Sequence, residues 1–115
     1  MSNDFVLYRA PGPLGFDSIL RSNNWLRHLL RHPELDGHLD DMPTLLSDPD
    51  VVVELADGSH HFYRAGLGTG KVADCFLYAV VREFATDDPG SRTVTSAYFT
   101  KVLKKGNIVW TRPIA

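Results

Sequence analysis

The chain changes its hydrophobic period near residue 50. Before that point, apolar residues recur at the three- and four-residue spacing of a helix, at Ile19, Leu20, Trp25, Leu26, Leu29 and Leu30. Beyond it, short runs rich in β-branched and aromatic residues alternate with Asp-Gly and Pro-Gly turns. This pattern predicts helices followed by strands.

The first half divides into an irregular segment, 1–16, and a helical segment, 17–47. Val6 to Tyr8 can form a short strand before Pro-Gly residues interrupt the chain. Asp17 or Ser18 is the expected N-cap of a helix that Asn23-Asn24 can split. Pro33 should end it near Arg31, because the residue before a proline avoids the α region. A second helix is expected over 35–46, kinked or divided by Pro43.

The second half predicts a sheet over 50–111. Five strands are expected at 51–55, 59–65, 74–84, 92–99 and 108–111, with tight turns that include Asp57-Gly58 and 104–107. The fold class is therefore α+β, with N-terminal helices packed on one face of a four- to five-stranded antiparallel β-meander. Residues 1–115 form one domain.

Composition narrows the class of protein. Of the 115 residues, 43% are apolar and 23% charged, and the net charge of −2 does not mark a nucleic-acid binder. The charge is uneven: residues 36–57 contain acidic residues and no Lys or Arg, and the end of the chain is mildly basic. The single Cys75 excludes an intramolecular disulfide. With no signal-peptide pattern and no long apolar run, we expect no membrane association and a cytoplasmic location.

Two histidines carry the first candidate chemistry. His28 and His32 lie four residues apart, so both can project from one side of a helix. They can transfer protons, or bind a metal if a third ligand is present. His32 can also cap the helix C-terminus. His28 is the stronger catalytic candidate, and Glu34 can orient either ring. His38 is expected to be exposed and to have no role.

The β half supplies cations and hydroxyls. Arg64 ends a strand before a glycine loop that contains Lys71, and either can approach a phosphate, although Arg64 can instead pair with the acidic middle segment. The loop lacks the P-loop pattern. Alternation places Ser96 and Tyr98 on one face of a strand that Lys101 follows. His60 and His61 face opposite ways, one of them exposed, in a structural role.

These motifs together resemble a known family. The matching segments are WLRHLLRHPEL, SDPDVVVE, HFYR, FLYAVV, VTSAYFT and KKGNIVW, within residues 24–110. In number and order they resemble the phage-type branch of the barnase/EndoU/colicin/RelE-like nuclease superfamily. The resemblance implies N-terminal helices, a four-stranded antiparallel meander and metal-independent RNA cleavage. It assigns function to His28, Arg64, Ser96, Tyr98 and, more weakly, Lys101. The chain departs from the family by having Ser96 for the usual Thr, and Asp74 or Cys75 where a lysine usually opens the apolar strand.

The resulting hypothesis is a ribonuclease that needs no cofactor or metal. His28 acts as base or acid, His32 is the second proton carrier, and Arg64 with Lys71 or Lys101 holds the phosphate. Ser96 also bonds the phosphate, and Tyr98 stacks on a base. RNA would be cleaved to a 2′,3′-cyclic phosphate, and an inhibitor or immunity protein and a homo-oligomer are further expected partners. The alternative is a catalytically inactive RNA- or protein-binding domain of the same fold. The enzyme hypothesis requires His28, Arg64 and Ser96 to meet in one open cleft.

Overall fold

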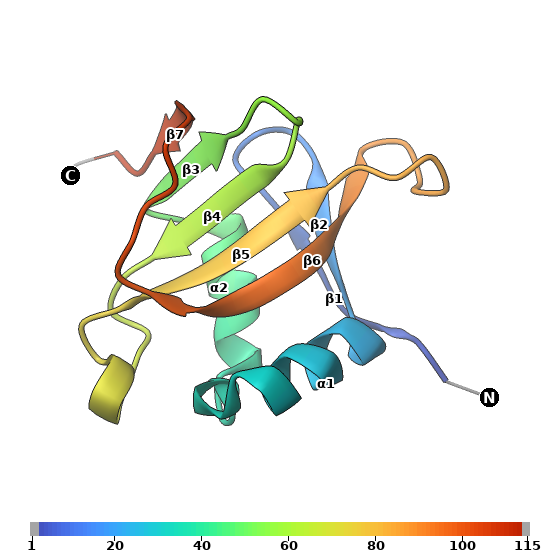
Figure 1. The fold of residues 1–115 in the computed structure, drawn as a ribbon. Coiled ribbons are helices and arrows are strands. Elements are labelled where there is room, and N and C mark those ends of the chain that lie inside the picture. Colours follow the sequence, from blue (N-terminus) through green and yellow to red (C-terminus); the bar gives the residue numbers. More distant parts are fainter. Residues whose placement is uncertain (1–2, 114–115) are drawn as a thin grey trace.

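One mixed sheet organises the chain in the computed structural model, which describes residues 3–113 (Figure 1). The ends of the predicted domain, residues 1–2 and 114–115, lie outside the described residues. The strand order is β1-β2-β6-β5-β4-β3-β7, and every neighbouring pair is antiparallel except the parallel pair β2 and β6. The strands are β1 (Val6–Pro11), β2 (Asp17–Arg21), β3 (Val51–Glu54), β4 (His60–Arg64), β5 (Phe76–Arg82), β6 (Ser91–Thr100) and β7 (Asn107–Thr111).

The predicted meander of four or five antiparallel strands is therefore wrong. The sheet has seven strands, because the first half of the chain adds β1 and β2 at one edge. Residues 17–21, expected to begin a helix, form β2, so Asp17 and Ser18 are not its N-cap. Ser18, Ile19 and Leu20 are consecutively buried, as in a strand covered on both faces. The two apolar residues of this short run, Ile19 and Leu20, do not by themselves distinguish a strand from a helix.

The end of the chain departs from the meander as well. Residues 104–107 do not form a tight hairpin turn after β6. The chain instead crosses to the far edge of the sheet, where β7 pairs with β3. Gly106 permits this approach: a Cβ there would lie 2.8 Å from the Glu54 carbonyl oxygen and 2.7 Å from Leu55 Cδ2. The backbone N–H of Lys104 donates to the Tyr63 hydroxyl at 2.8 Å and fixes the crossing segment.

The helical elements are short. They are α1 (Ser22–Arg31), η1 (Pro33–Leu35), η2 (Leu39–Asp41), α2 (Met42–Ser47) and η3 (Gly70–Val72). The helix end predicted before Pro33 is confirmed, but Asn23-Asn24 lies inside α1 and does not split it. Pro43 falls in the first turn of α2, where its missing N–H costs no helical hydrogen bond, so it starts the helix rather than kinking it.

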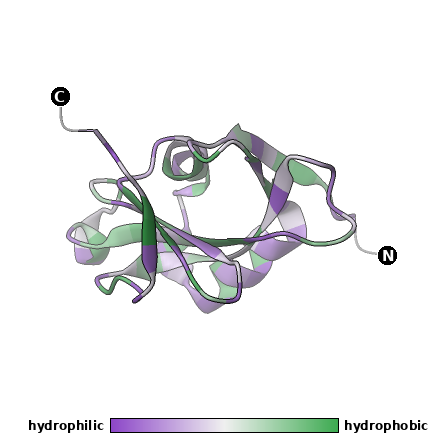
Figure 2. Cartoon of the chain, turned by 90° about the horizontal axis from the view of Figure 1, so that it is seen from above, coloured by the Kyte–Doolittle hydropathy of each residue, from purple (hydrophilic) through white to green (hydrophobic). Residues whose placement is uncertain are grey.

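The sheet has two unlike faces. The helix face carries apolar side chains that pack with residues of the helical segments, and its strand residues are Val52, Phe62, Leu77, Ala79, Val81, Val94, Ala97 and Phe99. The opposite face, here the tyrosine face, contains His61, Tyr63, Tyr78, Val80, Ser96 and Tyr98. Figure 2 shows the hydrophobic strand segments running through the centre of the molecule. The candidate site lies where α1 meets the edge of β6.

Candidate functional site

Helix α1 covers an edge of β6 that its neighbour leaves exposed. Strand β2 pairs with β6 only over residues 91–93, so the next carbonyl groups of β6 have no strand partner on that side among the described residues. Asn24 Nδ2 donates to the Val94 carbonyl oxygen at 3.0 Å, and His28 Nε2 bonds the Thr95 carbonyl oxygen at 2.7 Å. Two side chains one helical turn apart thus satisfy consecutive strand carbonyls.

This contact gives His28 a structural role. A carbonyl oxygen only accepts, so Nε2 carries the proton and Nδ1 is left deprotonated. Nδ1 is buried and has no hydrogen-bond partner among the described residues. Burial, more than the nearby positive charges, lowers the pKa of His28. A buried neutral ring with one nitrogen occupied is poorly placed to reach a substrate, so the preference for His28 over His32 is reversed.

His32 is the accessible histidine of the pair. It is the C-cap residue of α1, as the capping alternative expected, and its ring is about one-third exposed. The ring stacks on Tyr98, with centroids 5.0 Å apart and planes at 27°. Its Nδ1 lies 3.6 Å from Glu34 Oε1, so the expected carboxylate partner serves His32 rather than His28.

The predicted alternation along β6 is confirmed. Ala97 and Phe99 pack on the helix face, while Ser96 and Tyr98 are partly exposed on the tyrosine face. Tyr98 lies between His32 and Tyr78, and the Tyr78 ring centroid is 4.8 Å away with the two planes at 60°. His32 therefore covers one face of the Tyr98 ring.

Arg64 does not join this group. It shares the helix-face side of β4 with Phe62, opposite to the side of His61 and Tyr63. Its guanidinium donates to the Asp48 carboxylate at 2.9 Å and to the Asp48 carbonyl oxygen at 2.6 Å, and its side chain is 18% exposed. The predicted convergence of His28, Arg64 and Ser96 in one cleft is therefore wrong, and with it the enzyme hypothesis in the form that relies on His28 and Arg64. The alternative pairing of Arg64 with the acidic middle segment is confirmed.

The two lysines have different surroundings. Lys71 lies in η3, within an exposed loop, and no hydrogen bond or ion pair joins it to His32 or Tyr98 among the described residues. Lys101 follows β6 directly, three residues beyond Tyr98, and forms a 3.0 Å ion pair with Asp74. Both members of that pair are well exposed, so water screens it and the cation can be released at little cost. Lys101 is thus the better placed of the predicted cations.

The tyrosine face also contains a series of linked, buried hydrogen bonds that the sequence pattern does not predict. The Tyr78 hydroxyl donates to His61 Nδ1 at 2.6 Å, His61 Nε2–H donates to Ser59 Oγ at 2.9 Å, and Ser59 donates to Asp57 at 2.6 Å. Ser59 chiefly, then Arg82, hold the pKa of Asp57 far below its usual value. Burial lowers the pKa of His61 and raises that of Tyr78. These linked hydrogen bonds hold the His61 ring in its neutral form.

Sequence alternation had placed His60 and His61 on opposite faces, and this is confirmed, but neither is exposed. His60 contacts Glu54 through Nε2 at 3.2 Å and Arg92 through Nδ1 at 3.3 Å. The partners of both rings lie on other strands or turns. Only the register between β4 and β5 brings Tyr78 to His61, and no periodicity in a single strand reveals that pairing.

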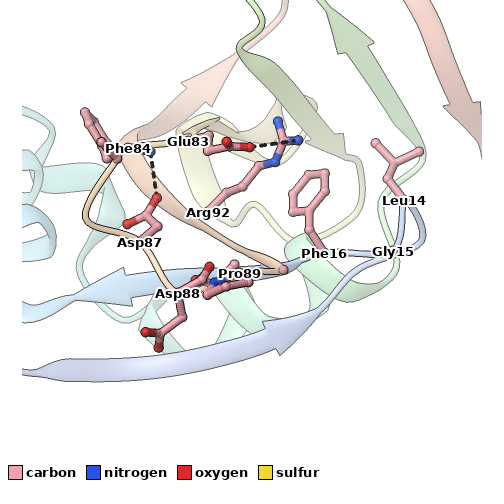
Figure 3. A pocket seen from close by; sticks show the side chains of 12 residues that line it. Leu14, Gly15, Phe16, Glu83, Phe84, Asp87, Asp88, Pro89 and Arg92 are labelled. Atoms are coloured by element: carbon pink, nitrogen blue, oxygen red, sulfur yellow. Dashed lines mark hydrogen bonds and ion pairs between the residues drawn. The ribbon is translucent and has the colours of Figure 1, made fainter.

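A surface hollow of about 380 Å³ lies elsewhere, at the loop between β5 and β6 (Figure 3). Phe16 and Arg92 line it, with the Arg92 guanidinium 4.4 Å from the centre of the Phe16 ring and 3.4 Å from Glu83. Residues 14–15, 83–85 and 87–91 form the rest of its wall. None of the predicted site residues lines this hollow.

Searches of protein-family models, of curated proteins and of solved structures each found no match to this chain. Across residues 3–113, no three His, Cys, Asp or Glu side chains are grouped so as to hold a metal ion. In the same part of the chain, no helix has the length and apolar character needed to span a membrane.

Proposed function

We propose that the chain is a metal-independent ribonuclease whose proton-transfer group is His32. The observation that carries the proposal is the placement of that imidazole at the end of α1. It is partly exposed, stacked on Tyr98 and 3.6 Å from the Glu34 carboxylate. Such a ring has a stable orientation, a carboxylate beside one of its nitrogens and access to a substrate.

The surrounding groups match the needs of RNA cleavage. His32 takes the proton of the ribose 2′-hydroxyl, whose oxygen attacks the adjacent phosphorus and displaces the 5′-oxygen. The Ser96 hydroxyl hydrogen-bonds a phosphate oxygen. The Tyr98 hydroxyl, on the same face of β6, is the donor for the departing 5′-oxygen. The products are a 2′,3′-cyclic phosphate and a 5′-hydroxyl.

Lys101 supplies the positive charge in this proposal, in place of Arg64. A phosphate competes easily with Asp74 for an exposed ammonium group. Releasing Arg64 would break two short hydrogen bonds to Asp48 at a largely buried guanidinium. The lysine that the family resemblance expects near Cys75 is thus replaced from the neighbouring strand end.

Cleavage of end-labelled RNA in the presence of a chelator tests the proposal. We expect wild-type protein to yield cyclic-phosphate ends and His32→Gln to cleave about 100-fold more slowly, because general acid–base groups contribute at least that factor. Leu30→Ala is the matched control, since this side chain on the same helix is 86% exposed. Equal rates for wild type and His32→Gln would eliminate the assignment.

The second candidate is an RNA- or protein-binding domain without catalysis. It is favoured by one observation: His28 and Arg64 are both held in structural contacts. In the same experiment this candidate predicts that labelled RNA is retarded on a native gel but stays intact. The expected inhibitor or immunity protein and the homo-oligomer stay predictions.

A further inference from the structure

A second group of reactive side chains lies away from His32. His38 was expected to be exposed and without a role, but it is 7% exposed. Its Nδ1 lies 2.8 Å from Asp41 Oδ2, and its Nε2 faces Thr69 Oγ1 at 3.4 Å. The three residues come from η2, from the residue before it and from the glycine loop, which is far away in the sequence.

We propose that Thr69, His38 and Asp41 form a nucleophile–base–carboxylate triad that reacts with activated carboxylic esters. The assignment of ring atoms is the one such chemistry requires: the carboxylate holds Nδ1–H, which leaves the Nε2 lone pair directed at a hydroxyl. The separation of 3.4 Å is long for a hydrogen bond, as is common in such sites before a substrate binds.

The base is held firmly while the nucleophile is accessible. The His38 ring packs edge-on against Phe99, with centroids 4.9 Å apart, so its direction is set by the sheet. Thr69 is exposed, between Gly68 and Gly70. A Cβ on Gly68 would collide with the Val72 carbonyl oxygen, so glycine there keeps the loop closed against η3. An ester carbonyl can thus approach Thr69 without any movement of His38.

The reaction proceeds in two balanced steps. Thr69 Oγ transfers its proton to His38 Nε2 and bonds to the ester carbonyl carbon, and the alcohol leaves with the proton that His38 returns. Water then attacks the threonine ester, gives one proton to His38 and releases the carboxylic acid as Thr69 recovers its hydrogen. Thr69 and His38 are catalytic residues here, and Asp41 is a positioning residue that acts through His38.

The triad is independent of the proposed ribonuclease activity, because it contains none of His32, Ser96, Tyr98 and Lys101. The probe is p-nitrophenyl acetate, with nitrophenolate release followed by absorbance and the acetylated residue located by peptide mass spectrometry. We expect an acetyl ester on Thr69 that hydroxylamine removes. Adventitious acetylation of Lys71 would give an amide that resists hydroxylamine.

Three variants make the test decisive. Thr69→Val keeps the shape of an exposed side chain and should abolish the labelled ester, and His38→Gln should slow its formation about 100-fold. Asp41→Asn should slow it and change its pH profile, because an amide favours the wrong imidazole tautomer. Circular dichroism checks folding, and if His38→Gln fails to fold, Thr69→Val and Asp41→Asn decide. Acetylation confined to lysine, or an unchanged Thr69 rate in the His38 or Asp41 variant, would overturn the proposal.

Discussion

The two faces of the sheet are built from the same strands but stabilised in different ways. On the helix face, side chains such as Phe62 and Leu77 are fully buried against apolar residues of the helical segments. On the tyrosine face, Tyr63 and Tyr78 are equally buried, but their hydroxyls and His61 form specific hydrogen bonds. Apolar contact is tolerant of small shifts, whereas a buried hydrogen-bond chain fixes one arrangement.

The residues that stabilise the fold also differ from the residues of the candidate site. His28 and Arg64, which the sequence favoured for catalysis, contact strand carbonyls and the acidic Asp48. Tyr98 and Ser96 lie on the tyrosine face, next to the only strand edge that α1 reaches with polar side chains in the described chain. Substitutions on each face should therefore reduce stability by different amounts and for different physical reasons.

Phe62→Ala should produce the largest loss of stability. Removing a fully buried aromatic ring from the helix face leaves a cavity, and we expect the free energy of unfolding to fall by about 3–5 kcal/mol. Urea unfolding followed by circular dichroism measures this change. Phe5→Ala is the control, because that ring is 57% exposed. A loss below about 1 kcal/mol would show that this face is not the main core.

Tyr78→Phe should have a smaller effect, through one polar atom rather than a cavity. It removes the hydroxyl that donates to His61 Nδ1 inside the tyrosine face, and an unsatisfied buried nitrogen costs about 1–3 kcal/mol. In Tyr8→Phe the lost partner, Asp40, is exposed, and the change should stay within about 0.5 kcal/mol. Equal effects of the two substitutions in urea unfolding would contradict a role for the buried chain.

The smallest expected effect is a dependence of stability on pH that both faces share. Burial lowers the pKa values of His28, His60 and His61 below the ordinary 6.5. Between the folded and unfolded values the unfolded chain binds more protons, so this stabilisation is complete above about pH 6.5 and is lost as the pH falls through the folded values. The pKa of Asp57 is lowered as well, and the stabilisation that this gives is lost only as the pH falls below 3.8.

The urea midpoint should accordingly decrease between about pH 7.5 and about pH 5.5. Part of that slope should disappear in His61→Asn, which removes one of the three rings while keeping a polar side chain. The charged neighbours of His61 include Lys104, Arg82 and Asp57, and raising the salt concentration separates their contribution from that of burial. A midpoint that rises on acidification would contradict the assignment of these histidines as buried and neutral.

Local sequence signals were sufficient to predict the structure of the middle of the chain. The turn at Asp57-Gly58 is confirmed, with Gly58 at a φ of 84°, and strands β3 to β6 follow one another near their predicted positions. The side-chain alternation along β4 and β6 is confirmed as well. These features depend on neighbours a few residues apart, so the sequence displays them directly.

Pairing between segments far apart in the sequence decided the structure of the two ends of the chain. Ile19 and Leu20 fit a helical stripe as well as a strand, and only their partnership with β1 and β6 made residues 17–21 a strand. The crossing of residues 101–106 and the place of β7 beside β3 depend on room at Gly106. Where a segment can adopt either of two conformations locally, the surface that each one buries decides which of them forms.

The same division applies to the candidate site. The sequence by itself determined that His28 and His32 share a side of a helix and that Ser96 and Tyr98 share a face of a strand. Only the tertiary structure decided that His28 bonds a strand edge, that His32 stacks on Tyr98, and that Arg64 pairs with Asp48. The periodicity of one element fixes the direction of a side chain, but its partner belongs to another element. That partner is set by strand register and helix packing across the whole chain.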